Sequence, residues 1–149
     1  MSMSETGRLS LPSRIKPYIM AHRGNRVLFA ENTLSAFRQA LLDGADILET
    51  DLHLSADGIF MCIHDGSVDR TTDGRGAVAD MNLAQLKKLN ATAGRPDLPF
   101  ETIPTLAEVA ALLPPDRALA LELKTDRFLE PEVCRRLASE LEQAGIRQR

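Results

Sequence analysis

The chain has 149 residues, a hydrophobic fraction of 44%, a charged fraction of 26% and a formal net charge of −3. This length suits about one domain, and the composition is ordinary for a globular protein. The slightly negative charge and the scarcity of aromatic residues argue against a nucleic-acid-binding surface. No apolar run approaches the ~20 residues of a membrane-spanning helix.

Two cysteines, Cys62 and Cys134, are too far apart for a CxxC pair or a zinc-type spacing. They favour a reducing, cytoplasmic location, with Cys62 as a small buried hydrophobic residue. Residues 1–17 contain no apolar segment typical of a signal peptide, and we expect a loose lead-in there.

Four short apolar runs predict buried strands, and each is followed by polar residues. The runs cover about 18–21, 46–52, 59–63 and 118–123. Apolar runs of this length between helical or turn-rich stretches are typical of α/β proteins. Because chemistry in such proteins gathers at the carboxyl ends of parallel strands, we expect these polar residues to form one cluster.

Helical periodicity predicts three helices between and after these strands. One begins near Asn32 or Thr33 and ends near Gly44, one runs from Thr105 through Leu113, and one follows Pro131. Residues 66–104 are rich in Gly, Asp, Thr and Pro, and a connection of this length is often functional. The order of elements predicts a parallel or mostly parallel α/β sheet.

Glu49 and Asp51 stand two residues apart on one predicted strand, so both carboxylates should point to the same face. Two such carboxylates repel each other unless a cation lies between them, and a hard divalent metal ion is the natural partner. Glu122, on another predicted strand, would add a third oxygen ligand. The alternative is a solvated strand face, which the apolar neighbours disfavour because charges near an α/β core need a partner.

Two histidines, His22 and His64, follow predicted strands and have a charged neighbour. Imidazole is the side chain best suited to moving protons near neutral pH, although a purely structural role is the alternative for each. By the alternation of side chains along a strand, His53 would share the face of Glu49 and Asp51, although it lies beyond the expected end of that strand. It is either a neighbour of the site or merely exposed.

Arg23 and Lys124 are candidate anion-binding residues. Arginine offers a bidentate fork and lysine a point charge, and both suit phosphate. For Lys124 the alternative is a salt bridge with Glu122, which is compatible because that pair would position the lysine. The dinucleotide and phosphate-loop patterns are absent from the sequence, as is a serine-centred triad motif.

A series of short motifs carries a resemblance to a known family. In chain order they are His22-Arg23-Gly24, Glu31-Asn32-Thr33, Gly44-Ala45-Asp46, Glu49-Thr50-Asp51, Asp57-Gly58, His64-Asp65, Arg70-Thr71-Thr72, Ile103-Pro104-Thr105-Leu106 and Glu122-Leu123-Lys124. Over residues 18–146 the chain resembles the glycerophosphodiester phosphodiesterases. Each motif alone is weak evidence, whereas the series is specific.

The resemblance implies a TIM-type (β/α)8 barrel that hydrolyses a small-molecule glycerophosphodiester to an alcohol and glycerol 3-phosphate, in lipid metabolism. It also implies a divalent cation, Mg or Ca, and a small insertion at residues 67–104 that caps the site. The implied roles are metal ligation by Glu49, Asp51 and Glu122, acid/base chemistry by His22 and His64, and phosphate contacts by Arg23 and Lys124.

A complete (β/α)8 barrel takes about 250 residues. The 149 residues with four expected strands therefore suggest about the first half of such a barrel, over residues 18–149. A half barrel exposes sheet edges that favour pairing with another chain. We expect self-association, a separate chain that supplies the rest, or an inactive remnant. The other enzymatic alternative is a related lipid phosphodiesterase, such as a phospholipase D-like toxin, which secretion signals and paired cysteines would favour.

Overall fold

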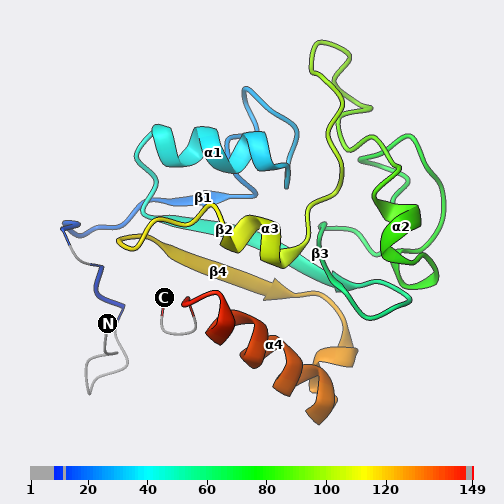
Figure 1. Cartoon of the computed structure of the whole chain (residues 1–149). Coiled ribbons are helices and arrows are strands. Elements are labelled where there is room, and N and C mark those ends of the chain that lie inside the picture. Colours follow the sequence, from blue (N-terminus) through cyan, green and yellow to red (C-terminus); the bar gives the residue numbers. More distant parts are fainter. Residues whose placement is uncertain (1–8, 12, 147–148) are drawn as a thin grey trace.

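The computed structural model describes residues 9–11, 13–146 and 149 (Figure 1). Four strands form one sheet: β1 (Met20–His22), β2 (Ile47–Leu54), β3 (Phe60–Cys62) and β4 (Ala118–Leu123). The helices are α1 (Leu34–Leu42), α2 (Leu83–Leu86), α3 (Leu106–Ala110) and α4 (Pro131–Gln143), with short 3₁₀ helices η1 (Val78–Asp80) and η2 (Asp126–Leu129). Every expected strand and helix has a counterpart, which confirms a mostly parallel α/β architecture.

β2 is the central strand of the sheet. One of its edges pairs with β4, in parallel, over six residue pairs. The first part of its other edge pairs in parallel with β1, and this pairing ends where His22 lies opposite Glu49. The last part of the same edge pairs antiparallel with β3, and the last residue of β3 lies opposite Leu52. β1 and β3 therefore both leave β2 beside Thr50 and Asp51, from opposite directions.

The antiparallel pairing of β3 corrects an expectation from the sequence. The third apolar run was expected to end at the common edge of parallel strands, but it is the return arm of a hairpin from β2. The connection is a tight turn in which the Ser55 hydroxyl donates to Asp57 and accepts from the Ile59 N–H, and Gly58 has a φ of +79°. A turn this short can join only antiparallel strands, because a parallel pair needs a crossover.

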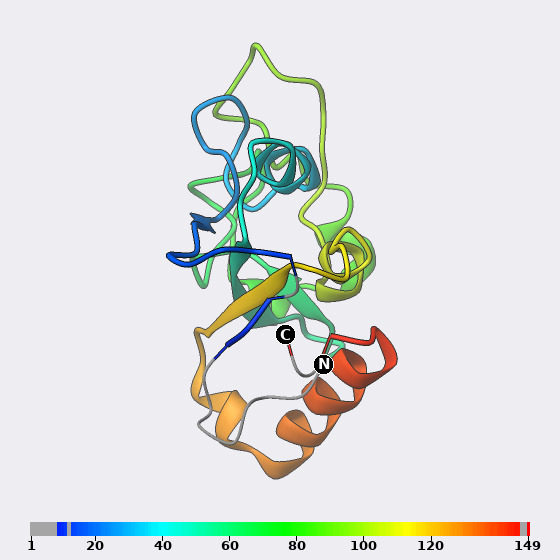
Figure 2. The same ribbon diagram turned by 90° about the vertical axis from the view of Figure 1, so that its left-hand side faces the viewer.

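Helices α1, α3 and α4 cover one face of the sheet, as the end-on view in Figure 2 shows. Leu48, Leu52 and Leu54 of β2 are at most 2% exposed and belong to the core on this face. Their partners on the helices include Phe37, Leu106, Val109 and Val133. The intervening residues of β2 must point to the opposite face, because side chains alternate along a strand.

The long connection between β3 and α3 is folded, with a hydrophobic cluster of its own. The buried members of this cluster are Met61, Ile63, Val68, Val78, Leu86, Ala91 and Ile103. Asn82 caps α2 in a capping box with Gln85, which fixes the start of this one-turn helix.

The described part of the expected lead-in contacts the rest of the chain. Leu11 is 3% exposed, and Arg14 forms an ion pair with Asp46 just before β2. Residues 1–8 and 12 of that segment lie outside the described residues. None of the helices in the described part has both the length and the apolarity that crossing a lipid bilayer needs.

Candidate active site

Three carboxylates come together on the face of the sheet opposite the helices. Glu49 and Asp51 share this face of β2, and Glu122 of β4 pairs in register with Asp51. Each of the three offers a carboxylate oxygen, and these oxygens lie within 4.8 Å of one another. Glu49 and Asp51 are buried, and Glu122 is exposed. The strand register thus produces the cluster that the spacing in sequence predicts.

The two buried carboxylates respond differently to their surroundings. Burial raises the pKa of Glu49, and the negative charge of Asp51 raises it further. Burial also acts against the ionised form of Asp51, but a hydrogen bond from Asn32 and the positive charges of Lys124 and Arg23 hold its pKa below the ordinary value. Glu49 is therefore the member whose charge most needs an added cation.

One oxygen of this cluster lacks a hydrogen bond among the described residues. Asp51 Oδ1 is buried, and its nearest partner is the ammonium of Lys124, whose Nζ lies 3.3 Å away without the geometry of a hydrogen bond. A buried acceptor that lacks a hydrogen bond is costly, so an added ligand there would be favourable. The donors are all carboxylate oxygens, which suit Mg or Ca. The residues present therefore fit a divalent cation.

A tight turn after β1 places Arg23 over the carboxylates. Arg23 and Gly24 have φ values of +60° and +79°, and a Cβ on Gly24 would lie 2.7 Å from the backbone of Ala36. The Arg23 N–H donates to Glu49 Oε2 at 3.0 Å. Its Nε lies 3.2 Å from Asp51 Oδ2 but is buried without a hydrogen bond among the described residues.

Lys124 lies just beyond β4, with Nζ 2.6 Å from Glu122 Oε1. The salt bridge considered from the sequence is thus present. Burial opposes the charge of Lys124, but a hydrogen bond to Glu122 and the negative charge of Asp51 raise its pKa. It is a fixed positive charge beside the cluster, and its contact with phosphate stays a prediction.

The two candidate catalytic histidines lie at the end of β1 and just after β3, at the gap between these strands, and of the two only His22 lies within ion-pair distance of the carboxylate cluster in the described part of the chain. His22 Nε2 lies 3.8 Å from Glu49 Oε2. His64 follows β3, and its Nδ1 lies 2.7 Å from Asp65 Oδ1. His53 lies within β2, because this strand runs to Leu54, and its Nε2 is 3.0 Å from the His64 carbonyl oxygen. His53 is therefore a neighbour of the site.

Sequence reasoning missed three residues that contact these groups. Asn32 is 4% exposed, donates from Nδ2 to Asp51 Oδ2 at 3.0 Å and accepts from Thr50 Oγ1 at 2.8 Å. Asp65 contacts His64, and Arg70 contacts Asp65. The signal was available, since Asn32 and Arg70 lie in two triplets that the sequence singles out without assigning them a role.

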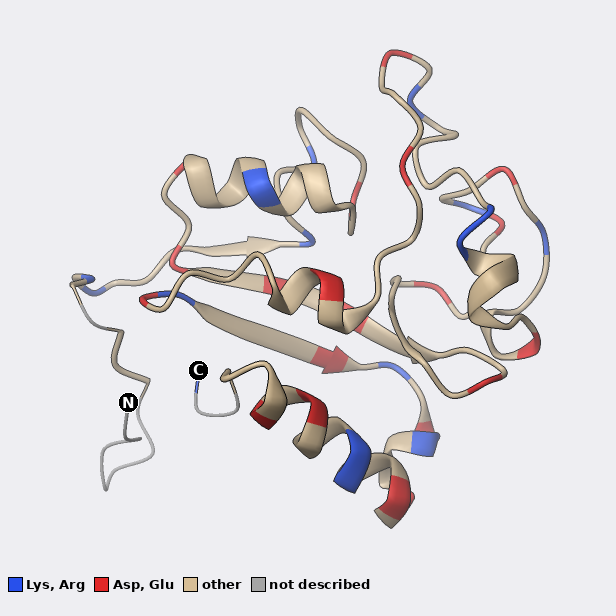
Figure 3. Cartoon of the chain, viewed as in Figure 1, with Lys and Arg blue, Asp and Glu red and all other residues tan. Residues whose placement is uncertain are grey.

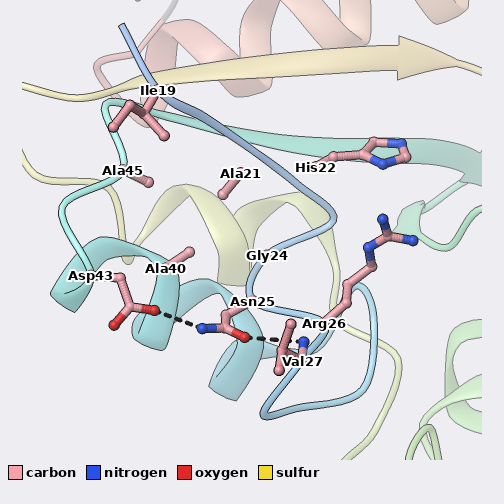
Figure 4. Close-up of a pocket in the computed structure, with 10 residues that line it drawn as sticks. All are labelled: Ile19, Ala21, His22, Gly24, Asn25, Arg26, Val27, Ala40, Asp43 and Ala45. Atoms are coloured by element: carbon pink, nitrogen blue, oxygen red, sulfur yellow. Dashed lines mark hydrogen bonds between the residues drawn. The ribbon is translucent and has the colours of Figure 1, made fainter.

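Opposite charges meet where the strands end. Figure 3 shows acidic positions along β2 and at the end of β4, and basic positions directly after β1 and β4. A pocket of about 610 Å³ opens beside His22, between β1, α1 and the loop after β1 (Figure 4). Two of the residues that line it are joined by a hydrogen bond, which Asn25 donates to Asp43 at 2.6 Å. Of the candidate site residues only His22 lines this pocket, so it adjoins the site without containing the carboxylates.

Comparisons with known proteins identify the family of this chain. A family model described as the glycerophosphoryl diester phosphodiesterase family matches residues 22–147. The chain belongs to this family. It is 37% identical over 137 residues to a glycerophosphodiester phosphodiesterase of Caldanaerobacter subterraneus, which covers 91% of this chain and 56% of that protein. It is 47% identical over 104 residues to a Bos taurus glycerophosphodiester phosphodiesterase 1, over 68% of this chain and 31% of that protein.

Solved structures of the family show the same arrangement of strands and helices. A glycerophosphodiester phosphodiesterase from Agrobacterium tumefaciens has a TM-score of 0.76 and 32% identity, covering 87% of this chain and 54% of that chain. An Oleispira antarctica phosphodiesterase in complex with the product sn-glycerol-3-phosphate has a TM-score of 0.74 and 36% identity, over 86% and 53%. The present chain thus spans about half the length of these solved relatives. Its four-stranded sheet is consistent with part of a TIM-type barrel.

Proposed function

We propose that this chain supplies the metal site and the acid/base groups for hydrolysis of glycerophosphodiesters to an alcohol and glycerol 3-phosphate. The observation that carries the proposal is the cluster of Glu49, Asp51 and Glu122, in which the buried Asp51 Oδ1 accepts no hydrogen bond from the described residues. Membership of the family and the relative that holds sn-glycerol-3-phosphate support the choice of substrate.

The three carboxylates would hold Mg or Ca, which when bound supplies positive charge to the phosphoryl oxygens. Arg23 and Lys124 lie against Asp51. They would bind the negative charge that the phosphodiester concentrates on its oxygens during hydrolysis.

His22 and His64 would move the protons. One takes a proton from the attacking oxygen, and the other gives a proton to the leaving alkoxide. A carboxylate only accepts hydrogen bonds, so Asp65 requires a proton on His64 Nδ1, which leaves Nε2 for the exchange.

The setting of the site is also part of the proposal. We place residues 67–104 as a cap over it, supported by the ion pairs of Arg70 with Glu31 and Asp65. Ile19 and Met20 are 64% and 53% exposed at β1, so we propose that further strands, from a second copy or another chain, complete the sheet there. Free thiols at Cys62 and Cys134 support a reducing, cytoplasmic location and do not favour the toxin-like alternative.

The test is release of glycerol 3-phosphate from glycerophosphocholine by this chain, with Mg, with Ca and with a chelator. We expect release that needs the metal, is lost in Asp51→Asn and persists in Glu132→Gln, which removes an exposed carboxylate in the first turn of α4. Calorimetry with each metal measures binding separately. Absence of release with either metal would overturn hydrolysis by this chain, and absence of metal binding would overturn the metal site.

A further inference from the structure

Charged side chains connect His64 to the carboxylate cluster without a break. His64 Nδ1 lies 2.7 Å from Asp65, and Arg70 donates to both oxygens of Asp65 at 2.8 and 2.9 Å. The same guanidinium donates to both oxygens of Glu31 at 2.8 and 3.1 Å. Arg70 thus ties the loop after β3 to the loop after β1, and Glu31 lies 3.4 Å from Arg23 at the far end.

Each nitrogen of Arg70 donates to one of two carboxylates, and four of its five N–H groups are used in this way. Its Nε and Nη2 bond to Asp65, and its Nη1 and Nη2 bond to Glu31. Two bidentate contacts fix the plane of the guanidinium, which a lysine could not reproduce. This separates Arg70 from Arg23, whose Nε is without a hydrogen bond among the described residues. The contacts of Arg70 therefore point to a role exerted through its two carboxylates.

Asp65 is the partner through which Arg70 can act on the chemistry. Hydrogen bonds from Arg70 and His64 hold the pKa of Asp65 well below its usual range, so it is a carboxylate at neutral pH. A carboxylate at Nδ1 selects the imidazole tautomer with the proton on that nitrogen. Free imidazole places the proton mainly on Nε2, where His64 would be unable to accept one. The pair therefore decides which ring nitrogen is available.

We propose that Arg70 is a positioning residue for His64: it holds Asp65 in place, and Asp65 holds the Nδ1–H of His64 so that Nε2 carries the lone pair. The catalytic consequence rests on the proposed function, since it matters only if His64 exchanges protons with a phosphodiester. The position of the proton on His64 Nδ1 does not rest on the proposed function, because the tautomer can be observed in the protein without substrate.

The test is the long-range 1H–15N spectrum of the whole chain labelled with 15N-histidine, recorded at about pH 9, where imidazoles are neutral. Only His22, His53 and His64 give signals. The set of signals that disappears in His64→Gln is assigned to His64. We expect the proton of His64 on Nδ1 in the wild type. Arg70→Gln should convert this to a mixture of tautomers, and Asp65→Asn should move the proton to Nε2.

A matched control lies five residues along the same segment. Arg75→Gln makes the same chemical change at a residue whose only ion pair among the described residues is with Asp69, at 3.5 Å. It should leave the His64 signals unchanged, as the His22 signals should be in every variant. If Arg70→Gln does not fold, Arg70→Lys decides, with a reduced Nδ1–H fraction expected. The inference is overturned if wild-type His64 carries its proton on Nε2, or if a folded Arg70 variant keeps the wild-type tautomer.

Kinetics add a second readout. With hydrolysis present, Arg70→Gln should lower kcat about 10-fold to 100-fold, less than the ~10²–10⁴ of losing the imidazole, with little change in KM. The double variant with Asp65→Asn should be no slower than the slower single variant, because both act through one contact. Additive losses would overturn the inference. A chain with the expected tautomer but no hydrolysis would contradict the proposed function and leave the placement of His64 intact.

Discussion

The two faces of β2 are built from alternate residues of one strand and follow opposite rules. On the helix side Leu48, Leu52 and Leu54 are at most 2% exposed and make the main core. On the other side Glu49 and Asp51 are also buried, yet they are charged and lie beside a third carboxylate. The first face stabilises the fold, and the second imposes a cost on it.

This difference indicates where the sequence has been shaped by function. Buried apolar residues contribute favourable transfer free energy, whereas clustered carboxylates repel each other and lose hydration. Arg23 and Lys124 offset part of that cost by lying against Asp51. Substitutions on the two faces should therefore separate stability from activity, even at adjacent positions.

The largest effect is expected for Glu49→Gln. Loss of one metal-binding charge removes several kcal/mol of charge stabilisation, which corresponds to a fall of about 10³-fold in metal-dependent hydrolysis. Because burial raises the pKa of Glu49, its ionised form is less favourable in the fold than in the unfolded chain. The metal-free variant should thus unfold at the same or a higher temperature, measured by circular dichroism. Retention of wild-type activity would remove Glu49 from the metal site.

The opposite result is expected one residue earlier. Leu48→Ala leaves a cavity at a position that is 0% exposed, and should lower the free energy of unfolding by about 2–5 kcal/mol. The measurement is urea denaturation without metal. Under conditions where the variant is folded, its metal affinity should stay near that of the wild type. A stable Leu48→Ala with weakened metal binding would mean that the two faces are not separable.

Much of this comparison could be predicted from the sequence. Alternation along 47–54 places Glu49 and Asp51 together, and short apolar runs locate all four strands. Local patterns of this kind depend on residues close in the chain, so they are readable without the fold.

The supporting contacts could not be predicted in the same way. Asn32 reaches Asp51, 19 residues away, and Arg70 reaches Glu31, 39 residues away. Such contacts depend on the turn after β1 and on the hairpin that returns β3 along β2, neither of which leaves a periodic signal. The direction of β3 was the main error, although only residues 55–59 separate β2 from β3, which is too short for a parallel crossover.

A smaller effect is expected at Asn32, which orients Asp51. Asn32 has a φ of +54°, so glycine can replace it without backbone strain while removing the side chain. Asn32→Gly should weaken metal binding about 10-fold to 100-fold, measured by calorimetry, because Asp51 loses its fixed hydrogen bond. Thr50→Val should act in the same direction, since the Thr50 hydroxyl orients the Asn32 amide. Unchanged affinity in both variants would show that Asp51 needs no such support.

The smallest expected effect is a pH dependence confined to the charged face. Hydrogen bonds to Arg70 lower the pKa of both Glu31 and Asp65, with burial opposing the shift. A carboxyl group whose pKa is lowered by folding contributes stability that is present above about pH 4 and is lost as the pH falls below it. The melting temperature should therefore fall on acidification through this range.

Arg70→Gln should make this fall of the melting temperature less steep. Leu48→Ala should instead lower the melting temperature at every pH and keep the slope, because a leucine does not titrate. Parallel profiles for Arg70→Gln and the wild type would mean that the acid sensitivity arises elsewhere in the molecule.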